Sequence, residues 1–246
     1  DDACTPSLSP ESRFWMKHPE LATRQLIAAG LLGAASVGAF APLNWFVLAW
    51  LTQAGLFILL SQEASRDRRM RRGALIGGAF GFGFFITGVS WVYVSLSTFG
   101  GMPSVLAALA TLLFCVFLAL YPALAGALFV RYAPKHGWHR ALLLAALLTL
   151  GEWLRGWIFT GFPWLALGYS QTPPSPLAGY VPLFGVFGVS LLTLFVGALL
   201  GESMRGLAAK QASPRASAAP PVLLTLAVLA GGAWLTLRRT NQGVVG

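Results

Sequence analysis

Apolar residues along the chain gather in seven runs, and short stretches that are polar or rich in glycine and proline separate them. The runs cover residues 25–40, 45–61, 74–96, 104–130, 141–154, 183–200 and 221–237. Helices that cross a bilayer need about 20 apolar residues, and the longer runs reach this length. The pattern predicts an all-α fold, a polytopic membrane bundle of about seven transmembrane helices. We expect a loose segment over residues 1–24, the helix domain over 25–238, and the start of a linker over 239–246.

The composition agrees with a membrane protein and argues against a soluble domain. Of the 246 residues, 56% are hydrophobic and only 10% are charged, whereas soluble domains have about 25% charged residues. The net charge of +9 would suggest nucleic acid as a partner of a soluble protein. Here the basic residues lie in short loops between apolar runs, so we expect the membrane as the partner and no nucleic acid.

The distribution of basic residues predicts the orientation of the bundle. Fourteen of the seventeen lysines and arginines lie in the N-terminal segment or in the loops over 61–73, 131–140 and 201–219. Positive residues favour the cytoplasmic side of a membrane. We therefore expect a cytoplasmic N-terminus, and the seventh helix would deliver the C-terminal end to the outer side.

The stretch from residue 151 to 171 differs from the plain apolar runs. It contains Glu152 and Arg155, whose spacing places them on one face of a helix, where they can pair. Charge inside a membrane costs a few kcal/mol, roughly, and persists mainly where it is paired or functional. A structural ion pair at a helix end and a functional pair both remain open. Arg155 is also suited to hold a phospholipid phosphate by bidentate hydrogen bonds.

Aromatic residues with polar neighbours mark the predicted outer ends of two helices. The candidate lipid-binding or gate residues are Trp91, Tyr93, Ser95, Glu152, Arg155, Phe162, Pro163, Trp164, Tyr169 and Gln171. Aromatic rings with a polar edge favour the membrane–water boundary. The pattern predicts an irregular aromatic segment at the outer interface after the fifth run, and an ordinary aromatic belt is the simpler alternative at the end of the third.

The chain shows no constellation for nucleophilic catalysis or metal binding. All three histidines lie on the predicted cytoplasmic side, away from the aromatic segments, which argues against a Ser-His-Asp triad. Cys4 and Cys115 are unsuited to a disulfide or a metal cluster. His136 and His139 lie three residues apart without a further ligand nearby. We expect neither a metal nor a cofactor.

Four motifs, taken in order, resemble the membrane part of apolipoprotein N-acyltransferase over roughly residues 25–238. They are FAPLNWF (40–46), WVYVSLSTFGGMP (91–103), EWLRGWIFTGFPWLALGYSQ (152–171) and PLAGYVPLFGVFGVS (176–190). The resemblance implies an enzyme of the bacterial inner membrane. Such an enzyme transfers an acyl chain from a phospholipid to the N-terminal diacylglyceryl-cysteine of an apolipoprotein, through a cysteine thioester.

The resemblance also implies where the chemistry would take place. The family's Glu-Lys-Cys triad belongs to a periplasmic carbon–nitrogen hydrolase domain that follows the seventh helix. None of the triad has a counterpart in this sequence, and Cys115 is not one. We therefore expect no catalytic residue in this chain and no activity from it alone. Its role would be that of a monomeric membrane part, with Trp91, Tyr93, Trp164 and Tyr169 bordering a lipid entrance.

Two alternatives remain, a small-molecule transporter and a non-catalytic membrane scaffold. Transporters usually carry ionisable residues and broken helices at mid-depth in the membrane. The predicted spans are almost free of charge, and the irregular segments lie at their outer ends, which disfavours the transporter. The scaffold differs from the acyltransferase only in whether a catalytic domain acts with it.

Overall fold

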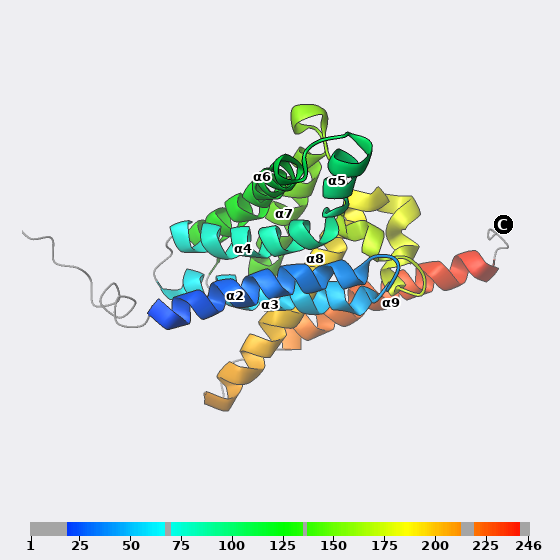
Figure 1. Cartoon of the computed structure of the whole chain (residues 1–246). Coiled ribbons are helices and arrows are strands. Elements are labelled where there is room, and N and C mark those ends of the chain that lie inside the picture. The colour runs from blue at the N-terminus through cyan, green and yellow to red at the C-terminus, as the bar shows by residue number, and fades with distance from the viewer. Residues whose placement is uncertain (1–18, 67–69, 135–136, 213–218, 242–246) are drawn as a thin grey trace, which may run out of the picture.

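The computed structural model describes residues 19–66, 70–134, 137–212 and 219–241. Every regular element in these ranges is a helix (Figure 1), which confirms the all-α prediction. The long helices are α2 (Pro19–Ser36), α3 (Phe46–Arg66), α4 (Met70–Gly88), α6 (Ser104–Tyr132), α7 (Trp138–Arg155), α8 (Val181–Ala212) and α9 (Ala219–Asn241). Each of them corresponds to one of the seven predicted apolar runs.

Several helices are longer than the apolar runs that predicted them. Helix α2 begins at Pro19, so residues 19–24 are helical where we expected a loose segment. Helix α8 continues to Ala212, beyond the predicted end at residue 200. The apolar run marks only the hydrophobic part of a helix, whereas polar turns such as the one with Glu20 and Arg24, 4.0 Å apart, extend it. Cys4, His136 and the end of the predicted linker lie outside the described residues.

Within the described residues, four segments are long and apolar enough to cross a membrane. They are Phe46–Ser65, Ser104–Tyr132, Pro176–Ala208 and Pro220–Arg238. A fifth span results if α4 and the following segment to Phe99 are taken together, although they are bent by 48°. The start of α2 and the end of α9 lie at opposite ends of the bundle (Figure 1), as an odd number of crossings requires. Seven crossings remain a prediction.

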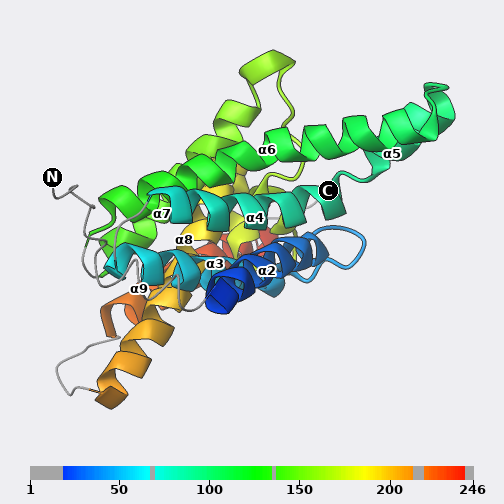
Figure 2. The same ribbon diagram turned by 60° about the vertical axis from the view of Figure 1, so that its left-hand side comes forward.

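Helix α4 packs closely between α2 and α6 (Figure 2). A Cβ atom added to Gly77 would lie 2.2 Å from the carbonyl oxygen of Pro122 in α6. A Cβ atom added to Gly83 would lie 2.0 Å from the carbonyl oxygen of Gly30 in α2. Small residues let helix backbones approach in this way. The GxxxG spacing of Gly77 and Gly81 therefore serves contacts within the chain, and α6 continues through Pro122.

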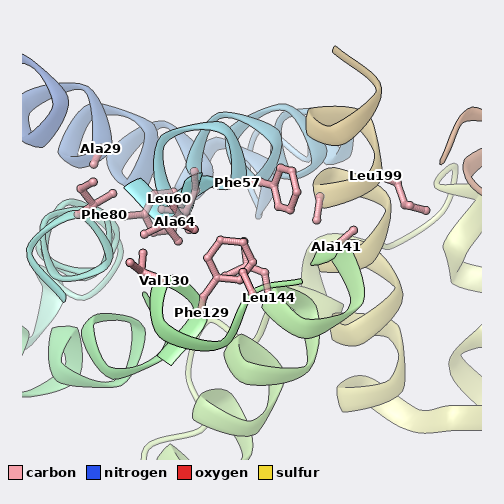
Figure 3. Close-up of a cluster of buried hydrophobic side chains, with 14 residues drawn as sticks. Ala29, Phe57, Leu60, Ala64, Phe80, Phe129, Val130, Ala141, Leu144 and Leu199 are labelled. Carbon is pink, nitrogen blue, oxygen red and sulfur yellow. The ribbon is translucent and has the colours of Figure 1, made fainter. Parts of the chain in front are cut away.

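Buried apolar side chains from six of the described helices, α2, α3, α4, α6, α7 and α8, meet in one cluster (Figure 3). Phe57 from α3 and Phe129 from α6 form its centre, with their ring centroids 5.9 Å apart. Leu144 from α7 and Leu199 from α8 pack against the same cluster. Dense packing of this kind holds helices together where lipid removes the hydrophobic driving force. The cluster fixes α7 relative to α3, and both helices contribute to the site described below.

Two helical runs are interrupted near their predicted outer ends. The run predicted over 74–96 is not one straight helix, because α4 ends at Gly88 and the chain bends before the short α5 (Trp91–Val94) and the π-helical turn η2 (Ser95–Phe99). Helix α8 is broken at Gly185, which has φ 64°, a left-handed conformation that glycine adopts readily. These breaks lead into the irregular segments that form the candidate site.

Candidate functional site

The last turn of α7 carries a buried arginine. Arg155 is 3% exposed, and its guanidinium carbon lies 4.9 Å from the centre of the Phe85 ring on α4. A cation above an aromatic ring is stabilised by the ring's quadrupole. The backbone carbonyl of Arg155 accepts a hydrogen bond from the Phe162 N–H at 2.8 Å. The end of α7 thus anchors the loop that returns after residue 156.

Glu152 anchors the next part of the same irregular segment. Its Oε1 accepts a hydrogen bond from the Leu167 N–H at 3.0 Å, at the start of the 3₁₀ turn η4 (Leu167–Ser170). The Gly168 N–H donates to the Ser190 Oγ on α8 at 2.8 Å. A carboxylate that accepts from a backbone N–H forms a charge-assisted hydrogen bond. Glu152 and Ser190 therefore fasten the segment to two long helices.

The expected direct pair between Glu152 and Arg155 does not form. Within the described residues, no hydrogen bond and no ion pair of 4.0 Å or less joins the two side chains. The Glu152 carboxylate instead faces the loop backbone, and the Arg155 guanidinium faces Phe85. Both side chains also line one interior cavity. Helical spacing places the two side chains on one face of α7. The loop that packs on this face donates a hydrogen bond to the carboxylate, so the carboxylate does not pair with the guanidinium.

An apolar groove of about 370 Å³ lies between α6 and the loop after α7. Phe114 and Phe117 of α6 form one wall, and Phe159 and Phe162 form the other. The ring centroids of Phe114 and Phe162 are 5.0 Å apart, and those of Phe117 and Phe159 are 5.7 Å apart. Arg155 also lines this groove. The groove therefore offers apolar walls with one cation.

The loop beside the groove has an unusual backbone. Phe159, Thr160 and Leu165 adopt φ values of 52°, 73° and 58°, a left-handed region that side chains with a Cβ atom rarely occupy. Each such residue costs about 1–3 kcal/mol, and this kind of strain gathers at functional sites. The loop is held in this shape by Arg155, Glu152 and Ser190 through the hydrogen bonds given above.

Two predicted gate residues meet although they are far apart in the sequence. The ring centroids of Trp91 on α5 and Trp164 on the loop are 5.5 Å apart, and Phe162 lies 6.4 Å from Trp164. Both tryptophans are exposed, and so is Pro163, which precedes Trp164 in the chain. This aromatic cluster joins the segment after α4 to the loop after α7.

The remaining predicted residues lie elsewhere. Tyr93 and Tyr169 are exposed, and Ser95 begins η2, where its carbonyl accepts from the Gly100 N–H. Gln171 is fully buried, and its amide accepts from Ser175 Oγ at 2.7 Å and donates to Ser170 Oγ at 2.8 Å. Gln171 thus stabilises the turn that follows η4 and does not line the groove.

Four residues that the sequence did not single out are brought to the site by the structure: Phe114, Phe117, Ser190, and Gln53, which lines the same cavity as Glu152 and Arg155. Phe114 and Phe117 lie in a uniformly apolar run, where nothing distinguishes them from residues that face lipid. Gln53 is a lone amide in the second apolar run. Because polar groups within membrane helices are rare and usually functional, this residue could have been found.

Comparison with known proteins identifies relatives of this chain. The model of the apolipoprotein N-acyltransferase N-terminal domain matches residues 32–199. The chain is 47% identical to an apolipoprotein N-acyltransferase of Nitrosomonas europaea over 176 residues, 72% of this chain and 35% of the relative. It is 45% identical to that of Ralstonia nicotianae over 175 residues, 70% of this chain and 32% of the relative.

The relative from Vibrio cholerae, also an apolipoprotein N-acyltransferase, is 43% identical over 179 residues, 72% of this chain and 34% of the relative. The chain therefore spans about a third of the length of the curated relatives that it matches. The matched residues include the helices and loops that form the groove, Glu152 and Arg155, and the aromatic cluster. This chain belongs to the apolipoprotein N-acyltransferase family, and it corresponds to the N-terminal domain of that family.

Proposed function

We propose that this chain is the membrane-embedded part of an enzyme that transfers an acyl chain from a phospholipid to the N-terminal diacylglyceryl-cysteine of apolipoproteins. The relatives' names and the matched N-terminal domain support this activity. The bundle would lie in the bacterial inner membrane and cross it seven times, with a cytoplasmic N-terminus. The clustering of basic residues at alternate loops supports this orientation. The catalytic groups would lie in a separate periplasmic domain.

The groove beside Arg155 is the single observation that carries the proposal. Its aromatic walls are suited to an acyl chain, since they offer apolar surface without a hydrogen-bonding requirement. The guanidinium of Arg155 can donate two hydrogen bonds to a phosphate or ester oxygen. In this proposal the groove seats a phospholipid, and the strained loop keeps Phe159 and Phe162 against it.

The aromatic cluster of Trp91 and Trp164 would border the entrance for lipid, with Tyr93 and Tyr169 exposed nearby in the sequence. Tryptophan and tyrosine side chains favour the depth of the headgroups. The molecule would act as a monomer, because the GxxxG face of α4 is already occupied by α6.

A chimera tests the proposed function. The residues of the Nitrosomonas europaea relative that align with residues 32–199 are replaced by those of this chain. The chimera is assayed for transfer of one acyl chain to a diacylglyceryl lipopeptide by mass spectrometry, with the unaltered relative as control. Transfer above the level of empty membranes supports the proposal. A chimera that inserts at normal levels but transfers nothing favours the non-catalytic scaffold.

Trp164→Ala in this chimera is expected to lower acyl transfer at limiting phospholipid by up to about tenfold, because an aromatic pair such as Trp91 and Trp164 contributes about 0.5–1.5 kcal/mol. Trp138→Ala is the matched control, since Trp138 is also exposed, begins α7 at the end away from the loop with Trp164, and lies within the residues that the chimera takes from this chain. The measurement is the initial rate against phospholipid concentration. Equal rates for the two variants would contradict a role of Trp164 at the entrance.

A further inference from the structure

A cavity between α3, α4, α6, α7 and α8 combines apolar walls with polar side chains from three helices. Gln53 reaches it from α3, Tyr121 reaches it from α6, and Glu152 and Arg155 reach it from α7. Phe84 and Phe85 of α4 are among its apolar lining residues. Arg155 lines this cavity as well as the apolar groove, so its guanidinium lies between the two.

Three of these polar residues present a buried atom that has no hydrogen-bond partner among the described protein atoms. These atoms are the Gln53 Oε1, the Glu152 Oε2 and the Arg155 Nη1. Gln53 and Arg155 are both 3% exposed. A buried polar atom without a partner costs about 1–3 kcal/mol, and more when it is charged. That all three atoms belong to residues lining one cavity indicates that a common ligand satisfies them.

The chemistry of the three atoms defines this ligand. Two of them are acceptors and one is a donor, so the ligand must donate at least two hydrogen bonds and accept at least one. The cavity offers about 50 Å³ for the centres of water molecules, whereas a single water needs about 10–15 Å³ of such space. An inorganic anion would be repelled by the Glu152 carboxylate. An acyl chain has no hydrogen-bonding groups, so it would leave all three atoms without a partner. Water fulfils every requirement.

We propose that this cavity is an internal hydration site, in which ordered water connects Gln53 on α3 with Glu152 and Arg155 on α7. The water completes the hydrogen bonding of two charged groups that make no direct contact. Gln53 is then a residue that positions water, and it couples α3 to the end of α7. The site does not depend on the acyltransferase activity proposed above.

Radiolytic footprinting of the chain in lipid nanodiscs tests this site. X-rays produce hydroxyl radicals from bound water, which modify neighbouring side chains even when these are shielded from solvent, and mass spectrometry measures the rate. Phe85 is 4% exposed and lines the cavity, whereas Phe57 is 0% exposed and lies in the apolar cluster. We expect several-fold faster modification of Phe85. Equal rates would overturn the proposal.

Gln53→Leu tests the role of the amide. We expect it to lower the modification of Phe85 towards the rate of Phe57. Gln62→Leu is the matched control, since Gln62 lies on the same helix but is exposed and does not line the cavity; it should leave the rate at Phe85 unchanged. A Phe85 rate that Gln53→Leu leaves unchanged would refute the assignment of Gln53. If Gln53→Leu does not fold, the comparison of Phe85 with Phe57 in the unaltered chain decides the proposal.

Discussion

Replacing Gly77 by alanine is expected to destabilise the bundle by about 2 kcal/mol, because added volume in a tight contact costs about 1–3 kcal/mol. The new Cβ atom would lie 2.2 Å from the carbonyl oxygen and 2.9 Å from the carbonyl carbon of Pro122. Both are backbone atoms in the middle of α6, so the contact cannot be relieved by rotating a side chain. Helices α4 and α6 must therefore move apart. This shifts α6, which carries the groove residues Phe114 and Phe117.

Gly78→Ala provides the matched control on the same helix. Its Cβ atom would meet the nearest atom, the Ala123 Cβ, at 3.4 Å, which is an ordinary contact. Since alanine favours helix over glycine by up to about 1 kcal/mol, this variant should be neutral or slightly more stable. The measurement is unfolding in mixed micelles with increasing sodium dodecyl sulfate. Equal midpoints for the two variants would refute the close contact between α4 and α6.

Glu152→Ala is expected to release the loop after α7 and to destabilise the protein by about 3 kcal/mol, because it removes an acceptor from a buried N–H and a carboxylate from beside a buried cation. The Leu167 N–H would lose its partner, and Arg155 would remain buried. Hydrogen exchange at the Leu167 amide should accelerate, since the fastening of η4 to α7 is lost.

Glu152→Gln separates the two effects. The glutamine retains an oxygen that can accept from the Leu167 N–H, so the exchange rate at this amide should stay close to that of the unaltered chain. The negative charge is lost, so the stability should fall in both variants. Hydrogen-exchange mass spectrometry and unfolding in mixed micelles measure the two quantities. If the Leu167 amide exchanges fast in Glu152→Gln, the hydrogen bond by itself does not protect this amide, and the prediction is wrong.

The sequence by itself determined the helices and the family of this protein. Seven apolar runs predicted seven long helices, and errors arose at polar ends such as residues 19–24, where hydropathy gives no indication of a helical turn. Four motifs in order indicated the family before any geometry was known. The irregular segment after α7 was also predictable, because Gly156, Gly161 and Pro163 disfavour a regular helix there.

Only the tertiary structure decided which side chains form the site. Hydropathy is the same for a phenylalanine that faces lipid and for one that faces a groove, so Phe114 and Phe117 could not be distinguished. The rotation of each helix about its axis determines these contacts, and close packing at residues such as Gly77 sets that rotation. The partner of Glu152 was decided in the same way, because the loop places the Leu167 N–H against its carboxylate. Gln53 shares a cavity with Arg155 for the same reason, since contacts between distant segments arise from packing and not from local composition.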